Sequence, residues 1–202
     1  MAFVKLPSFV TPAGIAQYPR LNVPDTKFVP EGNYSVKLEF TGDEAQELSA
    51  FLDTKMQESF AEAKKENPTK KIKEADAPYS WNDNGTLSVN FKMKASGTTK
   101  DGKAWNRKPA LFDAKGKPLD VGITVGGGSK LILSYTPAPF YTALIGAGLS
   151  MRLEAVQVIE LKEGGSNAQS SDSFGFKEQD GFDSKEVANP FQGETVGNQE
   201  DF

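Results

Sequence analysis

The final stretch of this 202-residue chain limits how much of it can fold. Residues 163–202 carry nine acidic and two basic side chains, a net charge of −7, and are rich in Ser, Asn, Gln and Gly without hydrophobic periodicity. Such a composition buries too little apolar surface to offset the chain entropy lost on folding. We therefore predict a disordered acidic C-terminal tail at 163–202 and a single domain at 1–162, which has a net charge of +3.

The residue types that are missing restrict the chemistry. The chain has no histidine and no cysteine, which excludes a Ser-His-Asp triad, a Cys-His pair, a disulfide and an ordinary zinc site. We therefore expect a non-enzymatic protein without a cofactor. The remaining enzyme hypothesis is a metal-dependent nuclease that uses carboxylates such as Asp83, Asp113 and Asp120, although these form no tight acidic motif.

Nothing in the sequence is typical of a membrane-spanning or secreted chain. No run of eighteen apolar residues occurs, and such a run is the usual mark of a membrane-spanning helix. Residues 1–7 also lack the apolar core of a secretory signal. We expect no membrane contact.

Alternating apolar and polar residues predict several strands. The clearest pattern is at 87–94, where every second residue from Leu87 to Met93 is apolar. We expect the other strands at 35–40, 111–112, 129–135 and 149–161. Between Pro137 and Tyr141, two prolines predict a loop.

One helix is expected early in the chain. Thr41 and Glu44 have the spacing of a capping box, and apolar residues then recur every four positions from Leu48 to Phe60. This helix should cover about 43–66 and end before Pro68. One inserted helix among five or so strands, with no alternation of strand and helix, predicts an all-β fold: a five-stranded OB-fold barrel with one inserted α-helix.

Basic and aromatic residues gather around the 87–94 strand. Lys92 and Lys94 lie on its polar face, Trp105 stands near Arg107, and Phe140-Tyr141 follows a proline. Proteins bind single nucleic-acid strands with positive grooves that follow the phosphates and with aromatic rings on which bases stack. An ordinary solvated sheet face is the alternative explanation of the lysines. The distribution of charge favours a nucleic-acid groove. Residues 43–76 have a net charge of −3, while the rest of residues 1–162 has a net charge of +6.

The tail also contains several phenylalanines. Five phenylalanines lie between residues 174 and 202, and the last of them, Phe202, follows Glu200 and Asp201. A terminal aromatic with its own carboxylate can fill a basic pocket or a partner's groove. A weakly basic body joined to an acidic tail can attract a polyanion and can also be blocked by that tail.

Several of these segments together resemble one family. They are Gly32–Val36, Asp83-Asn84-Gly85, Phe91–Lys94, the stretch from Gly126 to Leu161, and the acidic end of the tail. In these segments the chain resembles the single-stranded DNA-binding proteins of short-tailed, T-odd-type bacteriophages. Two positions depart from the family: Glu31 stands where a basic residue is expected, and no aromatic residue follows Lys94 at 95–97.

The resemblance implies an OB-fold with an inserted helix, usually dimeric, that coats DNA during phage replication and recombination in the cytoplasm of the infected bacterial host. It implies a tail that contacts the phage DNA polymerase and helicase-primase and competes with DNA. By matching position the resemblance implies DNA contact at Lys92, Lys94, Phe140 or Tyr141, and Lys5. With Trp105 and Arg107 from the basic and aromatic pattern, and with Lys130, the DNA-binding candidates are Lys5, Lys92, Lys94, Trp105, Arg107, Lys130, Phe140 and Tyr141. The partner-binding candidates are Glu200, Asp201 and Phe202. An RNA-binding or protein-interaction OB module is the alternative.

Overall fold

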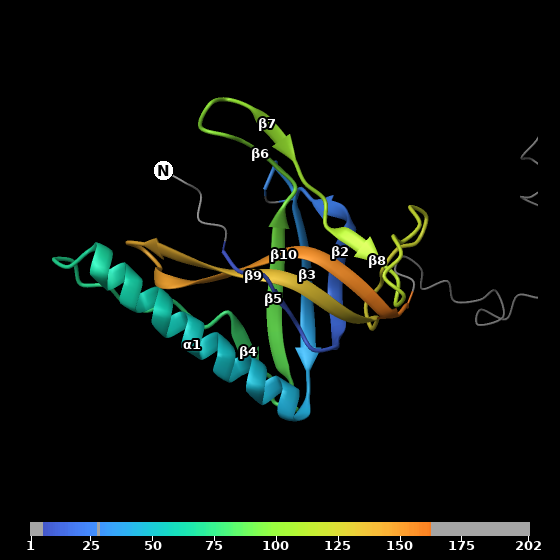
Figure 1. Ribbon diagram of the computed structural model, residues 1–202, viewed down its shortest axis with the longest axis horizontal. Helices are drawn as coiled ribbons and strands as arrows, with labels where there is room; N and C mark the ends of the chain where they lie inside the picture. The colour runs from blue at the N-terminus through green and yellow to red at the C-terminus, as the bar shows by residue number, and fades with distance from the viewer. Residues whose placement is uncertain (1–5, 28, 163–202) are drawn as a thin grey trace, which may run out of the picture. The chain divides into compact units, whose positions relative to one another are not determined.

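The computed structural model describes residues 6–27 and 29–162 (Figure 1). The chain divides into two units, Met1–Gly165 and Ser166–Phe202, and the description below concerns the first. Lys5 and the three tail candidates Glu200, Asp201 and Phe202 lie outside the described residues. The predicted domain boundary after residue 162 stays a prediction.

Five strands close into a barrel. In chain order they are β2 (Gly14–Asp25), β3 (Asn33–Phe40), β5 (Leu87–Lys94), β9 (Lys130–Thr142) and β10 (Gly146–Glu160). Around the barrel β9 pairs with β2, β2 with β3, β3 with β5 and β5 with β10, and a β9–β10 pairing closes the circuit (Figure 1). The pairing of β5 with β10 is parallel, and the others are antiparallel. The predicted OB-type barrel is confirmed.

The barrel interior is the main core. Buried side chains alternate strictly with less buried ones along β3, and along β5 they alternate in the same way except that Ser88 is also buried. Phe91 meets Tyr135 of β9 edge to face, with ring centroids 5.2 Å apart. Burial raises the pKa of Tyr135 to about 12, so its hydroxyl stays neutral over the whole range in which the protein would be handled.

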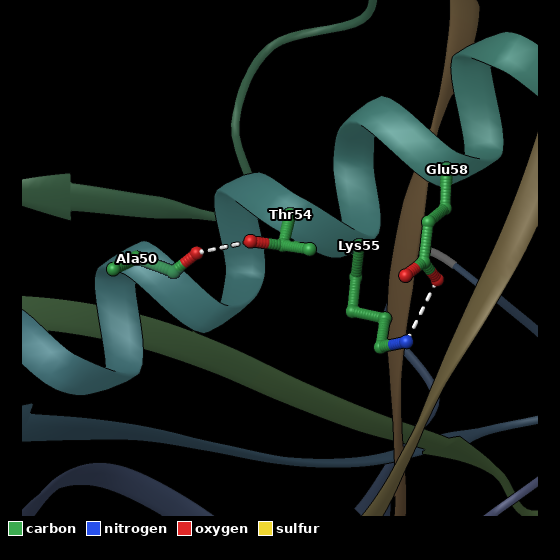
Figure 2. A network of polar contacts seen from close by, with 4 residues as sticks. All are labelled: Ala50, Thr54, Lys55 and Glu58. Carbon is green, nitrogen blue, oxygen red and sulfur yellow. Dashed lines mark hydrogen bonds and ion pairs between the residues drawn. The ribbon is translucent and has the colours of Figure 1, made fainter.

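Helix α1 covers Gly42–Glu66, close to the predicted bounds. Thr41 occupies the N-cap position with extended backbone, but its hydroxyl makes no capping hydrogen bond, so the predicted capping box is not formed. Leu48 and Leu52 face the barrel. Along the helix Lys55 pairs with Glu58 at 2.7 Å, and the Thr54 hydroxyl donates to the carbonyl of Ala50 (Figure 2). An exposed pair of this kind adds little stability.

Several short strands lie outside the closed barrel. β1 (Phe9–Val10) pairs with β9, β4 (Tyr79–Trp81) pairs with β5, and β8 (Ala110–Phe112) runs parallel to β10. β6 (Ser96–Thr98) and β7 (Ala104–Asn106) form a hairpin that stands away from the barrel (Figure 1). Within the described residues no helix is both long and apolar enough to cross a membrane.

The set of predicted strands omits one member of the barrel. The strand predicted at 111–112 is confirmed as β8, which lies outside the closed barrel, while β2, which belongs to the barrel, was overlooked. The reason is a register shift in β2 between Gln17 and Arg20, which breaks the alternation of apolar residues.

The predicted loop around Phe140 and Tyr141 is a strand. β9 continues to Thr142, and Pro137 and Pro139 lie opposite Met151 and Leu149 of β10. The two prolines are two residues apart, so their backbone nitrogens face the same side of the strand. Proline is tolerated in a sheet where this nitrogen, which carries no N–H, faces away from the paired strand. On that edge β1 reaches only Ser134 and Tyr135.

Candidate nucleic-acid interface

A row of basic residues crosses the outside of the barrel. Arg20 of β2 lies opposite Ser35 of β3, Ser35 lies opposite Lys92 of β5, and Lys92 lies opposite Arg152 of β10. Directly opposed residues in a sheet point to the same face. That face is the outer one, because Arg20, Lys92 and Arg152 are exposed while their chain neighbours Leu21, Phe91 and Leu153 are buried.

Polar residues extend this surface on both sides of the row. On one side Lys37 lies between Gln17 and Asn90, and on the other Asn33 lies opposite Lys94. Beyond Lys37 the carboxylate of Glu39 accepts a hydrogen bond from the Gln17 side chain at 3.0 Å. The surface therefore has a basic centre, and the carboxylate of Glu39 at its margin is already hydrogen-bonded.

Two neighbouring hollows lie on this surface and share Lys92 and Ser150. The first, of about 440 Å³, also has Lys37, Tyr79 and Phe140 in its wall. The second, of about 470 Å³, is lined by Lys94, Trp105, Arg107 and Arg152 among others. We call the two together the basic groove. It joins Lys92, Lys94, Trp105, Arg107 and Phe140, five residues selected from the sequence.

Trp105 is held in place by the β6–β7 hairpin. It lies opposite Gly97, and a Cβ atom at position 97 would come within 2.5 Å of the indole Cζ2. The Arg107 guanidinium carbon is 4.4 Å from the centre of the indole ring. A half-buried flat ring with a cation against it combines a stacking surface with a phosphate partner.

Phe140 and Tyr141 point to opposite sides of β9. Phe140 lines the first hollow together with Lys92. Tyr141 packs with Phe60 of α1 against a small second core of Ala63, Ile72 and Ala147, and the Lys70 amine lies 5.9 Å from its ring centre. Of the two alternatives only Phe140 lies in the basic groove.

Tyr79 gives the first hollow a second ring. Its hydroxyl donates a 2.8 Å hydrogen bond to Asp53 Oδ1 of α1. Burial first, and then this hydrogen bond and the charge of Asp53, raise the pKa of Tyr79. The phenol therefore stays protonated and tied to the helix, which fixes the ring at the rim of the groove.

Lys130 is not part of the basic groove. Lys130 begins β9, ten residues from Phe140 and thus roughly 30 Å along the strand. Its amine lies 3.8 Å from Glu160 Oε1, and it lines neither hollow of the basic groove. Lys5 lies outside the described residues.

Sequence reasoning missed three cations of the surface, and it noted Tyr79 near the 87–94 strand without selecting it as a site residue. Lys37 and Arg152 each stand between buried residues in strands that were expected, so strict alternation could have identified them. Arg20 follows the register shift of β2, where alternation fails. The position of Tyr79 depends on pairing between β4 and β5 and left no signal in the pattern.

The acidic residues of the nuclease hypothesis do not form a site. Within the part of the chain that the structure describes, no group of three or more His, Cys, Asp and Glu residues could hold a metal ion. Asp113 instead closes a turn: its Oδ1 accepts hydrogen bonds from the backbone N–H groups of Lys115 and Lys117, at 2.9 and 2.8 Å.

Comparison with known proteins gives consistent results. The family model "Single-stranded DNA-binding protein, Bacteriophage T7" matches residues 13–161. The single-stranded DNA-binding proteins of Escherichia phage T7 and Enterobacteria phage T3 are each 36% identical over 92 residues, which is 44% of this chain and 39% of each relative. The match thus spans well under half the length of these curated relatives.

Solved structures agree in fold. The crystal structure of gp2.5, a single-stranded DNA-binding protein of bacteriophage T7, superimposes with a TM-score of 0.68 at 29% identity, covering 77% of this chain and 92% of that chain. The single-stranded DNA-binding protein of bacteriophage Enc34, solved in complex with single-stranded DNA, gives a TM-score of 0.58 over 79% of this chain and 89% of that chain. At 15% identity the latter shows a shared fold alone.

Proposed function

Because this chain belongs to the family of single-stranded DNA-binding proteins represented by that of bacteriophage T7, we propose that it binds single-stranded DNA without sequence preference and without catalysis. The observation that carries the proposal is the position of Lys92. It stands in the basic row across the barrel and in the wall of both hollows, so cations and aromatic rings share one continuous surface.

The groove assigns a role to each kind of side chain. Lys92, Lys94, Arg107 and Arg152 neutralise phosphates, and Trp105 and Phe140 offer rings to the bases. Contacts to phosphate carry no sequence information, and stacking tolerates every base because every base has a π-face. Indifference to sequence follows from this choice of contacts.

The acidic tail has a separate role in the proposal. Its charge of −7 is opposite to that of the groove, so it competes with DNA for the basic surface. Glu200, Asp201 and Phe202 at its end bind the phage DNA polymerase and helicase-primase. In this reading the protein is a homodimer that acts in phage DNA replication and recombination, in the cytoplasm of the infected host.

Tryptophan fluorescence tests the binding function directly. The chain has two tryptophans, and Trp105 lies in the groove while Trp81 does not line it. In a Trp81→Phe variant we expect single-stranded DNA to quench the remaining emission. In the matched Trp105→Phe variant we expect little quenching.

The choice of nucleic acid decides between the alternatives. A single strand of DNA should bind more tightly than its duplex and at least as tightly as RNA of the same sequence. A clear preference for RNA would instead indicate recognition of the 2′-hydroxyl and support an RNA-binding module. Cleavage of a labelled strand with Mg²⁺ or Mn²⁺ would contradict the absence of catalysis.

A further inference from the structure

Tyr18 has an unusual backbone and an unusual exposure. Among the described residues it is the one non-glycine residue with a positive φ, 48°, a region that bulky residues rarely occupy and that costs stability. Its side chain is 82% exposed. Packing in the core therefore does not compensate for the strained backbone, and the ring is available to another molecule.

A β-bulge produces this conformation. Gln17 lies opposite Lys37 and Arg20 lies opposite Ser35, so two residues of β2, Tyr18 and Pro19, match one residue of β3. Bulges bend a strand and re-aim its side chains, often beside functional sites. The bulge brings Arg20 into register with Ser35 and hence with Lys92.

Tyr18 therefore stands at the β2 end of the basic row. From β2 to β10 the row crosses four strands, which is three spacings of about 4.8 Å, or roughly 14 Å. A third hollow of about 150 Å³ adjoins the groove at Lys92 and Ser35 and reaches β2 at Asp25, whereas Arg20 and Tyr18 do not line it. Asp25 is the acidic group on this side.

We propose that Tyr18 and Arg20 form an outlying subsite for single-stranded DNA. The strand leaves the basic groove at Lys92, crosses Ser35 and reaches β2, where Arg20 neutralises a phosphate and the Tyr18 ring stacks on the adjacent base. The proposal rests on the proposed function and adds a path across the strands to it. The strained backbone at Tyr18 is then retained because it presents the ring to the nucleotide.

Oligothymidylates of increasing length test the subsite on the full chain. Tyr18→Ala removes the ring, Tyr18→Gly removes it and also suits the positive φ, and Tyr18→Phe keeps it. Leu144→Ala is the matched control, because Leu144 is 83% exposed at the tip between β9 and β10. Short oligomers that fill only the groove should bind all variants equally.

Longer oligomers should separate the variants. Loss of one stacked base weakens binding between about 5-fold and about 150-fold, and we expect this loss in Tyr18→Ala and Tyr18→Gly but not in Tyr18→Phe or Leu144→Ala. Tyr18→Gly should melt no lower than the wild type, which excludes misfolding as the cause. In Arg20→Gln the log–log salt slope should fall by about 0.7, the value of one phosphate contact, with Lys115→Gln unchanged.

Each contrary result has its own meaning. If the wild type binds no oligomer, the proposed function itself fails. If the wild type binds and Tyr18→Ala equals it at every length, only the subsite is overturned. If Tyr18→Ala alters the sedimentation of the free protein and leaves DNA binding intact, Tyr18 is a contact between protein molecules and the subsite is overturned as well.

Discussion

Lys92 shows how the core determines the position of a surface charge. Its exposed side chain follows Phe91, whose ring is fully buried and packed against Tyr135. Because successive residues of a strand point to opposite faces, fixing Phe91 inside fixes Lys92 outside. The sequence pattern could therefore predict Lys92 and Lys94 as surface cations without knowing what lies opposite them.

Trp105 depends on a single glycine, which allows a test at one residue. In Gly97→Ala the new methyl group would meet the indole at 2.5 Å, so the ring or the hairpin must move. We expect single-stranded DNA binding to weaken by about 1–3 kcal/mol, the value of one stacked base, with less quenching of Trp105. Binding and quenching are measured in the Trp81→Phe background.

Gly122→Ala is the control for this substitution. Nothing lies within 4 Å of a Cβ atom at position 122, so this variant should bind as the wild type does. Wild-type affinity in Gly97→Ala, with normal quenching, would show that Trp105 is not a stacking platform.

Whole elements were predictable where one physical pattern governs them. α1 and the strands β3 and β5 were found close to their bounds because each has one buried face with a regular period. β2 was missed because its bulge changes the phase of that period, and the end of β9 was missed because its prolines are typical of loops. A local sequence pattern does not show where pairing with another strand accommodates a bulge or a proline.

The candidate site was predictable only in part for a related reason. The sequence identified cations and rings on single elements, but the pattern of one element does not determine which residues of another element lie opposite it. Lys92 and Arg152 are sixty residues apart in the chain and lie opposite each other across a parallel pairing. The same limit left Phe140 and Tyr141 as equal alternatives until β9 separated them to its two sides.

At the scale of the whole molecule, the separation of charge between body and tail predicts competition. Removing residues 163–202 takes away a charge of −7, so single-stranded DNA should bind about tenfold more tightly at low salt. The difference should vanish near 1 M salt, where charges are screened within about 3 Å. Weaker binding by the truncated chain would contradict self-competition.

The tail end can be tested apart from this electrostatic effect. Phe202→Ala leaves the charge unchanged, so DNA binding should persist while binding of the polymerase or helicase-primase is lost. Phe174→Ala is the matched control, since it removes a phenylalanine from the start of the tail.

If the basic row across the barrel binds the phosphates of a single strand, the salt dependence of binding must change when the row loses charge. Lys92→Gln combined with Arg152→Gln should reduce the log–log slope by about 1.4, because each phosphate contact contributes about 0.7. The control pair Lys115→Gln and Lys117→Gln, on the turn after β8, should leave the slope unchanged. A slope that stays the same in the Lys92 and Arg152 variant, or falls equally in both pairs, would show that the basic row does not bind the phosphates.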